Sequence, residues 1–153
     1  MAAFFGEFEA KLDNKGRLRL PSRLTAQLNP SEGVAVGSEP APLILNRGFE
    51  KCLILYPQPE WQAMMARLES LNQFVQKNRD FVRYFLRGAT EITLDTADRL
   101  LLPRTLQEYA AIDTDVVLLA YFDKIEIWAK NEYDRFMSQE PANFGELAEE
   151  ILG

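Results

Sequence analysis

A short stretch near the start of the chain gathers basic side chains that could bind an anion. Residues 11–23 contain one acid, Asp13, and five basic residues: Lys11, Lys15, Arg17, Arg19 and Arg23. A strand through residues 17–20 would place both arginines on one face and the two leucines between them on the other. Guanidinium groups donate in pairs to phosphate and to the O6/N7 edge of guanine, and a two-stranded ribbon fits the DNA major groove. The residue types therefore predict a surface for phosphate or DNA, with Asp13 orienting Arg17 or closing the turn.

The same pattern occurs a second time in the chain. Residues 12–24 match residues 94–106 at seven of thirteen positions, and the matches include Asp13 with Asp95 and Arg17 with Arg99. Residues 53–61 match residues 125–133 in a second block. The offsets of the two blocks are 82 and 72, so the first copy has ten extra residues. We assign them to residues 29–42, which are rich in Pro, Gly and Ser and typical of a loop.

Each copy predicts the same order of elements. Alternating apolar residues before Asp13 indicate a half-buried strand, the Asp-x-x-Gly-Arg sequence indicates a tight turn, and residues 17–20 indicate the returning strand. Pro21 ends that strand and can begin a short helix. Two strands near residues 43–45 and 53–56 follow, and Pro59 begins a helix with one apolar face.

These elements predict an α+β fold in which two tandem β-hairpin repeats pair about a pseudo-twofold axis into one β-barrel with peripheral helices. Neither copy alone has enough strands to bury both of its faces. We expect residues 1–153 to form a single structural unit with repeats at 5–71 and 89–137. A connecting helix is expected at residues 73–87, and an amphipathic C-terminal helix at residues 141–152.

The residue counts exclude much chemistry. The chain has no His, which removes imidazole bases and His metal ligands, and its one Cys excludes an intrachain disulfide and a cysteine zinc cluster. Cys52 lies in an apolar strand-like run and is expected to be an inert buried thiol. No phosphate-loop sequence or marked carboxylate pair is present. We expect no enzyme activity, cofactor, metal or small-molecule substrate. With neither a signal peptide nor an apolar run of spanning length, we expect a cytoplasmic protein that does not contact membranes.

The overall charge argues against nucleic acid, but its distribution does not. The chain has a net charge of −6, while residues 11–23 sum to +4 and residues 139–153 to −4. Nucleic acids select for clustered Lys and Arg more than for a basic total. The acidity is thus concentrated in the tail, away from the basic stretch.

The duplicated turn with its flanking strands, and the Leu-Ile-Leu-Tyr-Pro run leading to Glu60 and Trp61, resemble the MraZ family over nearly the whole chain. This resemblance implies a bacterial transcriptional regulator, usually a repressor, of the division and cell-wall gene cluster that contains its own gene. It also implies a swapped-hairpin barrel of the AbrB type, assembly into rings, association with the nucleoid and binding to repeated double-stranded DNA motifs. The family's two signatures fall here on Asp13 and Arg17, and on Asp95 and Arg99.

The second copy departs from the first in charge. Asp98 stands where the first copy has Gly16, and Leu101 stands where it has Arg19. Asp tolerates a positive φ better than most residues, so we expect the turn to survive. The charges of Asp95, Asp98, Arg99 and Arg104 in the second copy sum to zero. We therefore expect unequal participation of the two turns, with further phosphate contacts from Lys11, Arg23 and Arg104.

Three alternatives remain open from the sequence. The Asp-x-x-x-Arg pattern is also typical of a turn closed by a surface ion pair, which contributes little energy. The acidic total and the amphipathic C-terminal segment favour a homo-oligomeric interaction module without DNA specificity. Another AbrB-like regulator, such as an antitoxin, is a third reading, although such chains generally hold one hairpin unit and must dimerise.

Overall fold

The protein is described by a computed structural model that covers residues 4–28, 42–139 and 143–153. The elements of the first repeat are β1 (Phe4–Lys11), β2 (Arg17–Arg19), α1 (Ser22–Leu28), β3 (Leu43–Arg47), β4 (Leu53–Tyr56) and α2 (Gln58–Glu69). The elements that follow are α3 (Gln76–Leu86), β5 (Thr90–Ile92), β6 (Arg99–Leu101), α4 (Arg104–Tyr109), β7 (Asp115–Phe122), β8 (Lys124–Ala129), α5 (Lys130–Met137) and α6 (Phe144–Leu152). The expected loop at 29–42 lies outside the described residues except for Pro42.

The strands form an antiparallel six-stranded sheet and a separate two-stranded ribbon. The sheet order is β1-β7-β8-β4-β3-β5, and the ribbon pairs β2 with β6. If each strand is exchanged for its counterpart in the other repeat, the sheet order reads the same from the opposite end. Two pairs of equivalent residues face each other, Leu18 with Leu100 and Ile54 with Glu126. The strand pairing therefore has a twofold pattern, and it joins the two repeats where β2 meets β6 and where β4 meets β8.

The two strands of each predicted hairpin form their ladders with strands of the other repeat and not with each other. Leu12, the residue after β1, shares one bridge with Leu18 of β2, whereas β1 pairs with β7 along its whole length. Strand lengths account for this exchange, because β1 and β7 have eight residues each and β2 and β6 have three. Strands β1 and β2 each form their ladder with a partner of their own length in the other repeat.

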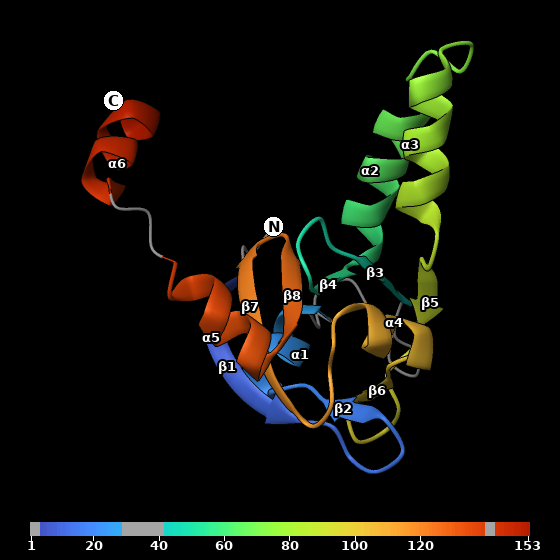
Figure 1. Ribbon diagram of the computed structural model, residues 1–153. Coiled ribbons are helices and arrows are strands. Elements are labelled where there is room, and N and C mark those ends of the chain that lie inside the picture. The colour runs from blue at the N-terminus through green and yellow to red at the C-terminus, as the bar shows by residue number, and fades with distance from the viewer. Residues whose placement is uncertain (1–3, 29–41, 140–142) are drawn as a thin grey trace.

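The expected barrel is not closed, because the six-stranded sheet is open. Strand β1 lies at one edge and β5 at the other, and neither has a second neighbour among the described strands. The eight residues of β1 and the three of β5 are too unequal to close the sheet with a full ladder. The fold is thus α+β, with an open antiparallel sheet, a short ribbon and surrounding helices (Figure 1).

The core between the sheet and the ribbon is built largely from leucines of both repeats. Leu18 and Leu100, on the inner face of the ribbon, are fully buried. After each ribbon strand a proline ends the ladder and begins a helix, whose first hydrogen bonds run from Leu24 to the Pro21 carbonyl and from Leu106 to the Pro103 carbonyl. The same two leucines are buried, so α1 and α4 close the core at equivalent places.

Candidate nucleic-acid interface

The first Asp-x-x-x-Arg turn, residues 13–17, is organised by the carboxylate of Asp13. Its Oδ1 accepts hydrogen bonds from the backbone N–H groups of Lys15 and Arg17, each at 2.9 Å. Its Oδ2 accepts a bond of 2.7 Å from Nε of the Arg17 guanidinium. A backbone bond of 2.9 Å from Asp13 N–H to the Arg17 carbonyl closes the turn. Asp13 therefore both shapes the turn and orients Arg17.

The second turn, residues 95–99, has the same hydrogen bonds. Oδ1 of Asp95 accepts from the N–H groups of Ala97 and Arg99 at 2.9 Å, and its Oδ2 accepts from Nε of Arg99 at 2.8 Å. Asp98 takes a φ of +60° where Gly16 has +78°, so Asp98 adopts the left-handed conformation expected of it. The changed residue preserves the backbone of the turn.

Each turn is also bonded to the opposite repeat. The Gly16 carbonyl accepts a bond of 2.9 Å from Leu102 N–H, and the Asp98 carbonyl accepts one of 2.9 Å from Leu20 N–H. These bonds are equivalent under the repeat and flank the β2–β6 ladder. The two turns are therefore held beside one ribbon, although 82 residues separate them in the sequence.

The ribbon presents an exposed face that we call the arginine face, made of Arg17, Arg19, Arg99 and Leu101. Arg17 lies opposite Leu101, and Arg19 lies opposite Arg99. Arg19 and Leu101 are exposed, whereas Arg17 and Arg99 are half-buried beside their aspartates. The repeat and the alternation placed Arg17 and Arg19 on one face, but they did not show that Arg99 faces Arg19. Leu101 is 57% exposed among the arginines, which its replacement of a charged residue in the sequence does not by itself predict.

The electrostatics of the two turns favour charged aspartates. The backbone N–H of Arg17, with smaller effects from Lys15 N–H and the guanidinium, lowers the pKa of Asp13 below its usual value. The backbone N–H of Arg99 lowers the pKa of Asp95 in the same way. Within the described part of the chain, each arginine uses Nε for its aspartate and leaves both Nη nitrogens without a protein acceptor. Each turn thus offers a fixed guanidinium whose outer edge is available.

The remaining predicted residues surround the arginine face less closely. Lys15 is exposed in the first turn, and Lys11, at the end of β1, has its Nζ 3.8 Å from a carboxylate oxygen of Asp115. Lys11 and Arg19 line one shallow hollow beside the ribbon. Arg23 and Arg104 are exposed on α1 and α4, outside the ribbon. The structure therefore gathers Arg17, Arg19 and Arg99 and leaves the other cations at the periphery.

Two other expectations concern buried and membrane-spanning segments. Cys52 directly precedes β4. Its thiol is buried next to Trp128 and Tyr133, and this burial raises its pKa. A thiol in these surroundings stays protonated and unreactive.

Among the described residues, no helix combines the length and the apolar character that crossing a bilayer requires.

The fold and the paired turns define a class of protein, in which two repeats exchange strands and set two Asp-x-x-x-Arg turns on one ribbon. The chain matches the family described as "MraZ protein, putative antitoxin-like" twice, over residues 3–84 and 85–153. It is 40% identical to the transcriptional regulator MraZ of Flavobacterium psychrophilum, covering 100% of this chain and 94% of the relative. It is 38% identical to that of Christiangramia forsetii, with coverages of 100% and 95%. For Desulforamulus reducens the identity is 39%, with 97% of both chains covered.

The chain therefore belongs to the MraZ family, whose named relatives are transcriptional regulators.

Proposed function

We propose that the arginine face binds double-stranded DNA and that the protein regulates transcription by inserting the β2–β6 ribbon into the major groove. The observation that carries this proposal is the pairing of Arg19 with Arg99. Like charges directly opposite each other destabilise a ladder, and a bound anion would remove that cost. Arg19 has no carboxylate partner among the described residues. The charges of Asp13 and Asp95 are neutralised within their own turns, whereas the repulsion between Arg19 and Arg99 remains. Such a surface is suited to binding a polyanion.

Each residue has a distinct role in this proposal. Arg17 and Arg99, held at Nε by their aspartates, direct their Nη groups at base edges or phosphates. Arg19 and Lys15 contact phosphates, and the outlying cations Lys11, Arg23 and Arg104 add weaker phosphate contacts. Asp13 and Asp95 touch no DNA and orient the arginines.

We further propose that several protomers act together on repeated DNA motifs. The net charge of −6 repels DNA as it approaches, over a range set by the Debye length of about 8 Å at physiological salt, so one protomer binds weakly. A closed ring of copies would place many arginine faces on one rim. Each further engaged motif is then an intramolecular event, which raises avidity by roughly 10²–10⁴.

The biological setting follows from the family resemblance. We propose a cytoplasmic, nucleoid-associated repressor of the bacterial division and cell-wall gene cluster. The two repeats, 5–71 and 89–137, would act as one folding unit of swapped-hairpin type, since each depends on strands of the other for its ladder.

The test is selection of bound DNA from a random pool, followed by affinity measurements on DNA with one, two and three copies of the recovered motif. Affinity should rise steeply with copy number at fixed salt and fall when the spacing between copies is changed. Recovery of no common sequence would contradict specific binding. Equal affinity for one and three copies would leave a conventional single-site regulator.

A second candidate is a homo-oligomeric interaction module without DNA specificity. The observation that favours it is the exposed α6, with an apolar stripe and three glutamates. The two candidates differ in salt dependence on random DNA, because phosphate contacts release counterions. A band shift that is absent at low salt would support the interaction module.

A further inference from the structure

The last helix, α6, has an apolar stripe that the described protein does not cover. Its apolar residues recur at helical spacing: Phe144, Leu147, Ala148, Ile151 and Leu152. None of them is buried, and Ile151 and Leu152 are 75% and 85% exposed. A helix of nine residues is marginal alone in water, and most helical stability in proteins comes from packing an apolar face. Helix α6 therefore needs a partner surface.

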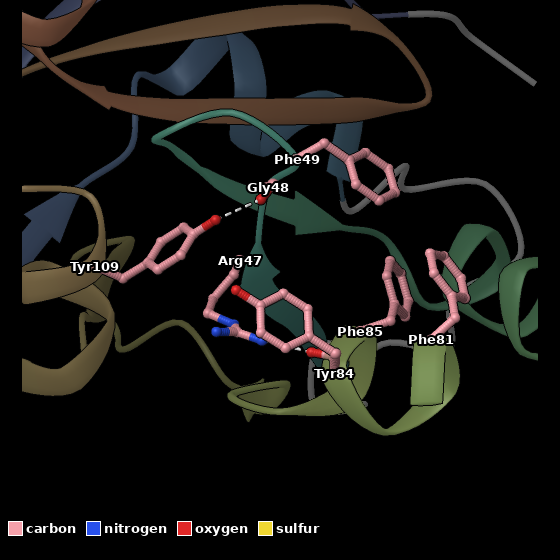
Figure 2. A pocket seen from close by; sticks show the side chains of 7 residues that line it. All are labelled: Arg47, Gly48, Phe49, Phe81, Tyr84, Phe85 and Tyr109. Carbon is pink, nitrogen blue, oxygen red and sulfur yellow. Dashed lines mark hydrogen bonds between the residues drawn. The ribbon is translucent and has the colours of Figure 1, made fainter. Parts of the chain in front are cut away.

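An aromatic hollow on the opposite side of the molecule offers such a surface. It lies between β3, α3 and α4 and is lined by Arg47, Phe49, Phe81, Tyr84, Phe85 and Tyr109 (Figure 2). Phe85 forms its buried floor and stacks on Phe81 with ring centroids 5.9 Å apart. Phe49 and Tyr84 stand at its rim and are 71% and 61% exposed. Exposed aromatic residues around a recess are typical of a protein-binding surface.

The hollow also contains a positive charge whose hydrogen bonds are incomplete. The Arg47 guanidinium lies 4.3 Å from the ring centroid of Tyr84 and 5.2 Å from that of Tyr109, and it donates to the Tyr84 carbonyl. Its Nε is buried without an acceptor in the described residues. Outside the lining of the hollow, α3 and the residue after it carry four cations and one acid: Lys77, Arg79, Arg83, Arg87 and Asp80, which lies 3.5 Å from Arg83. A ligand for this hollow should be apolar on one side and acidic at its edges.

We infer that α6 of one copy docks in the aromatic hollow of a second copy. Beside its apolar stripe α6 carries Glu146, Glu149 and Glu150 and no basic residue, which complements Arg47 and the cations of α3. The mode is an amphipathic helix in a groove, with anchors at i, i+3, i+4 and i+7.

The geometry of the single chain favours a second copy as the partner. Helix α5 is held against the sheet by Tyr133, whose ring packs edge-on against Trp128 with centroids 5.8 Å apart. Figure 1 shows α6 beyond α5, on the side of the molecule away from α3. Two complementary surfaces that face in different directions join copies head to tail, and such contacts close into rings when the rotation permits. The inference thus rests on the proposed self-association and assigns a contact to it.

Disulfide trapping between two different variants tests the docking directly. Ile151→Cys is made in one chain and Tyr84→Cys in another that carries a size tag, and the two are mixed and oxidised. Native Cys52 is buried, so the new thiols react first. Phe74→Cys replaces Tyr84→Cys in the control, because Phe74 is 95% exposed and lies outside the hollow. A mixed disulfide several times more abundant with Tyr84→Cys supports the docking, and equal yields overturn it.

Light scattering separates this inference from the proposed function. Ile151→Asp should shift the mass towards the single chain, whereas Gly145→Asp adds the same charge to α6 off the stripe, in open space, and should not. On three-motif DNA, Ile151→Asp should lose up to roughly 10²–10⁴-fold in affinity while one-motif binding stays unchanged. An assembled wild type whose mass Ile151→Asp does not alter overturns the docking alone. A wild type that stays a monomer overturns both the docking and the proposed assembly.

Discussion

The two Asp-x-x-x-Arg turns have the same hydrogen bonds to within 0.1 Å, yet they carry different charges. Lys15 and Arg19 in the first repeat are replaced by Ala97 and Leu101 in the second. The aspartate, the arginine and the positive-φ residue between them define the backbone, and the other positions are free to vary. Local folding and binding chemistry therefore depend on different residues of the same short segment, and each can be changed separately.

The largest expected effect is on the shared arginine of the first turn. Arg17→Ala should weaken specific DNA binding by about 1–3 kcal/mol, the usual value of one bidentate base contact. Fluorescence anisotropy on the selected motif measures this loss. The side chains of Arg17 and Asp13 are about one-third exposed to solvent, so their ion pair contributes little to stability. Thermal stability and oligomer mass should therefore stay near the wild-type values. An equal loss of stability or mass would favour the purely structural role of the ion pair.

The next effect distinguishes the two repeats by charge. Replacing Lys15 and Arg19 together by Gln should lower the slope of log affinity against log salt by about one unit for each lost phosphate contact. Arg99→Ala should change specificity or geometry more than this slope. If Arg99→Ala lowered the slope as much as the double substitution, the asymmetry between the repeats would be refuted.

A third substitution restores the missing charge of the second repeat. Leu101→Arg places a guanidinium opposite Arg17, as Arg19 stands opposite Arg99. The salt slope should increase by about one unit, with tighter binding to random DNA. Leu101 is exposed, and its substitution does not disturb the buried Leu100, so the unfolding temperature should change little. The control is Leu101→Gln, which should leave the slope unchanged.

The turn glycine and its counterpart should differ in stability. Gly16→Ala places a Cβ in the left-handed region and 2.8 Å from Nε2 of Gln107, which itself bonds the Leu102 carbonyl. We expect a loss of roughly 1–2 kcal/mol in the free energy of unfolding, measured by denaturant titration. Asp98→Gly relieves the same strain and should not destabilise. Comparable losses in both variants would show that the positive φ is not what these positions require.

The smallest effect is a pH dependence that both turns should share. Because hydrogen bonds lower the pKa of Asp13 and Asp95 in the folded state, their stabilisation is present above the usual Asp pKa of about 3.9. It is lost as the pH falls through the lowered folded values. Asp13→Asn and Asp95→Asn should each reduce the unfolding temperature at neutral pH, and the difference from wild type should close in acid. Unequal pH dependence would contradict the equivalence of the turns.

Local features were predictable from the sequence, whereas strand partners were not. The Asp-Gly turn, the helix after Pro21 and the burial of Leu18 all follow from residues within a few positions of each other. Period-two alternation identifies which face of a strand is buried but not which strand lies beside it. The ladder between β1 and β7 and the facing of Arg19 with Arg99 depend on residues far apart in the chain.

The aromatic hollow shows the same limit for surfaces. Its side chains come from β3, the segment after it, α3 and α4, and each aromatic residue alone indicates ordinary core packing. Charged residues on one side of an amphipathic helix, such as the cations of α3, usually indicate a solvated face. Only the packing of α3 and α4 against β3 brings Tyr84, Tyr109 and Arg47 together.

The exchange of strands also has a consequence for biosynthesis. Strand β1 is made before its partner residues, which run from Asp115 to Phe122. At about 5–20 residues per second, the nascent chain waits on the order of 5–20 s before this ladder can form. High contact order of this kind slows folding and leaves an unpaired edge open to other chains. The two halves of this protein therefore complete one another only after Phe122 has been made, and until then β1 stays exposed to other chains.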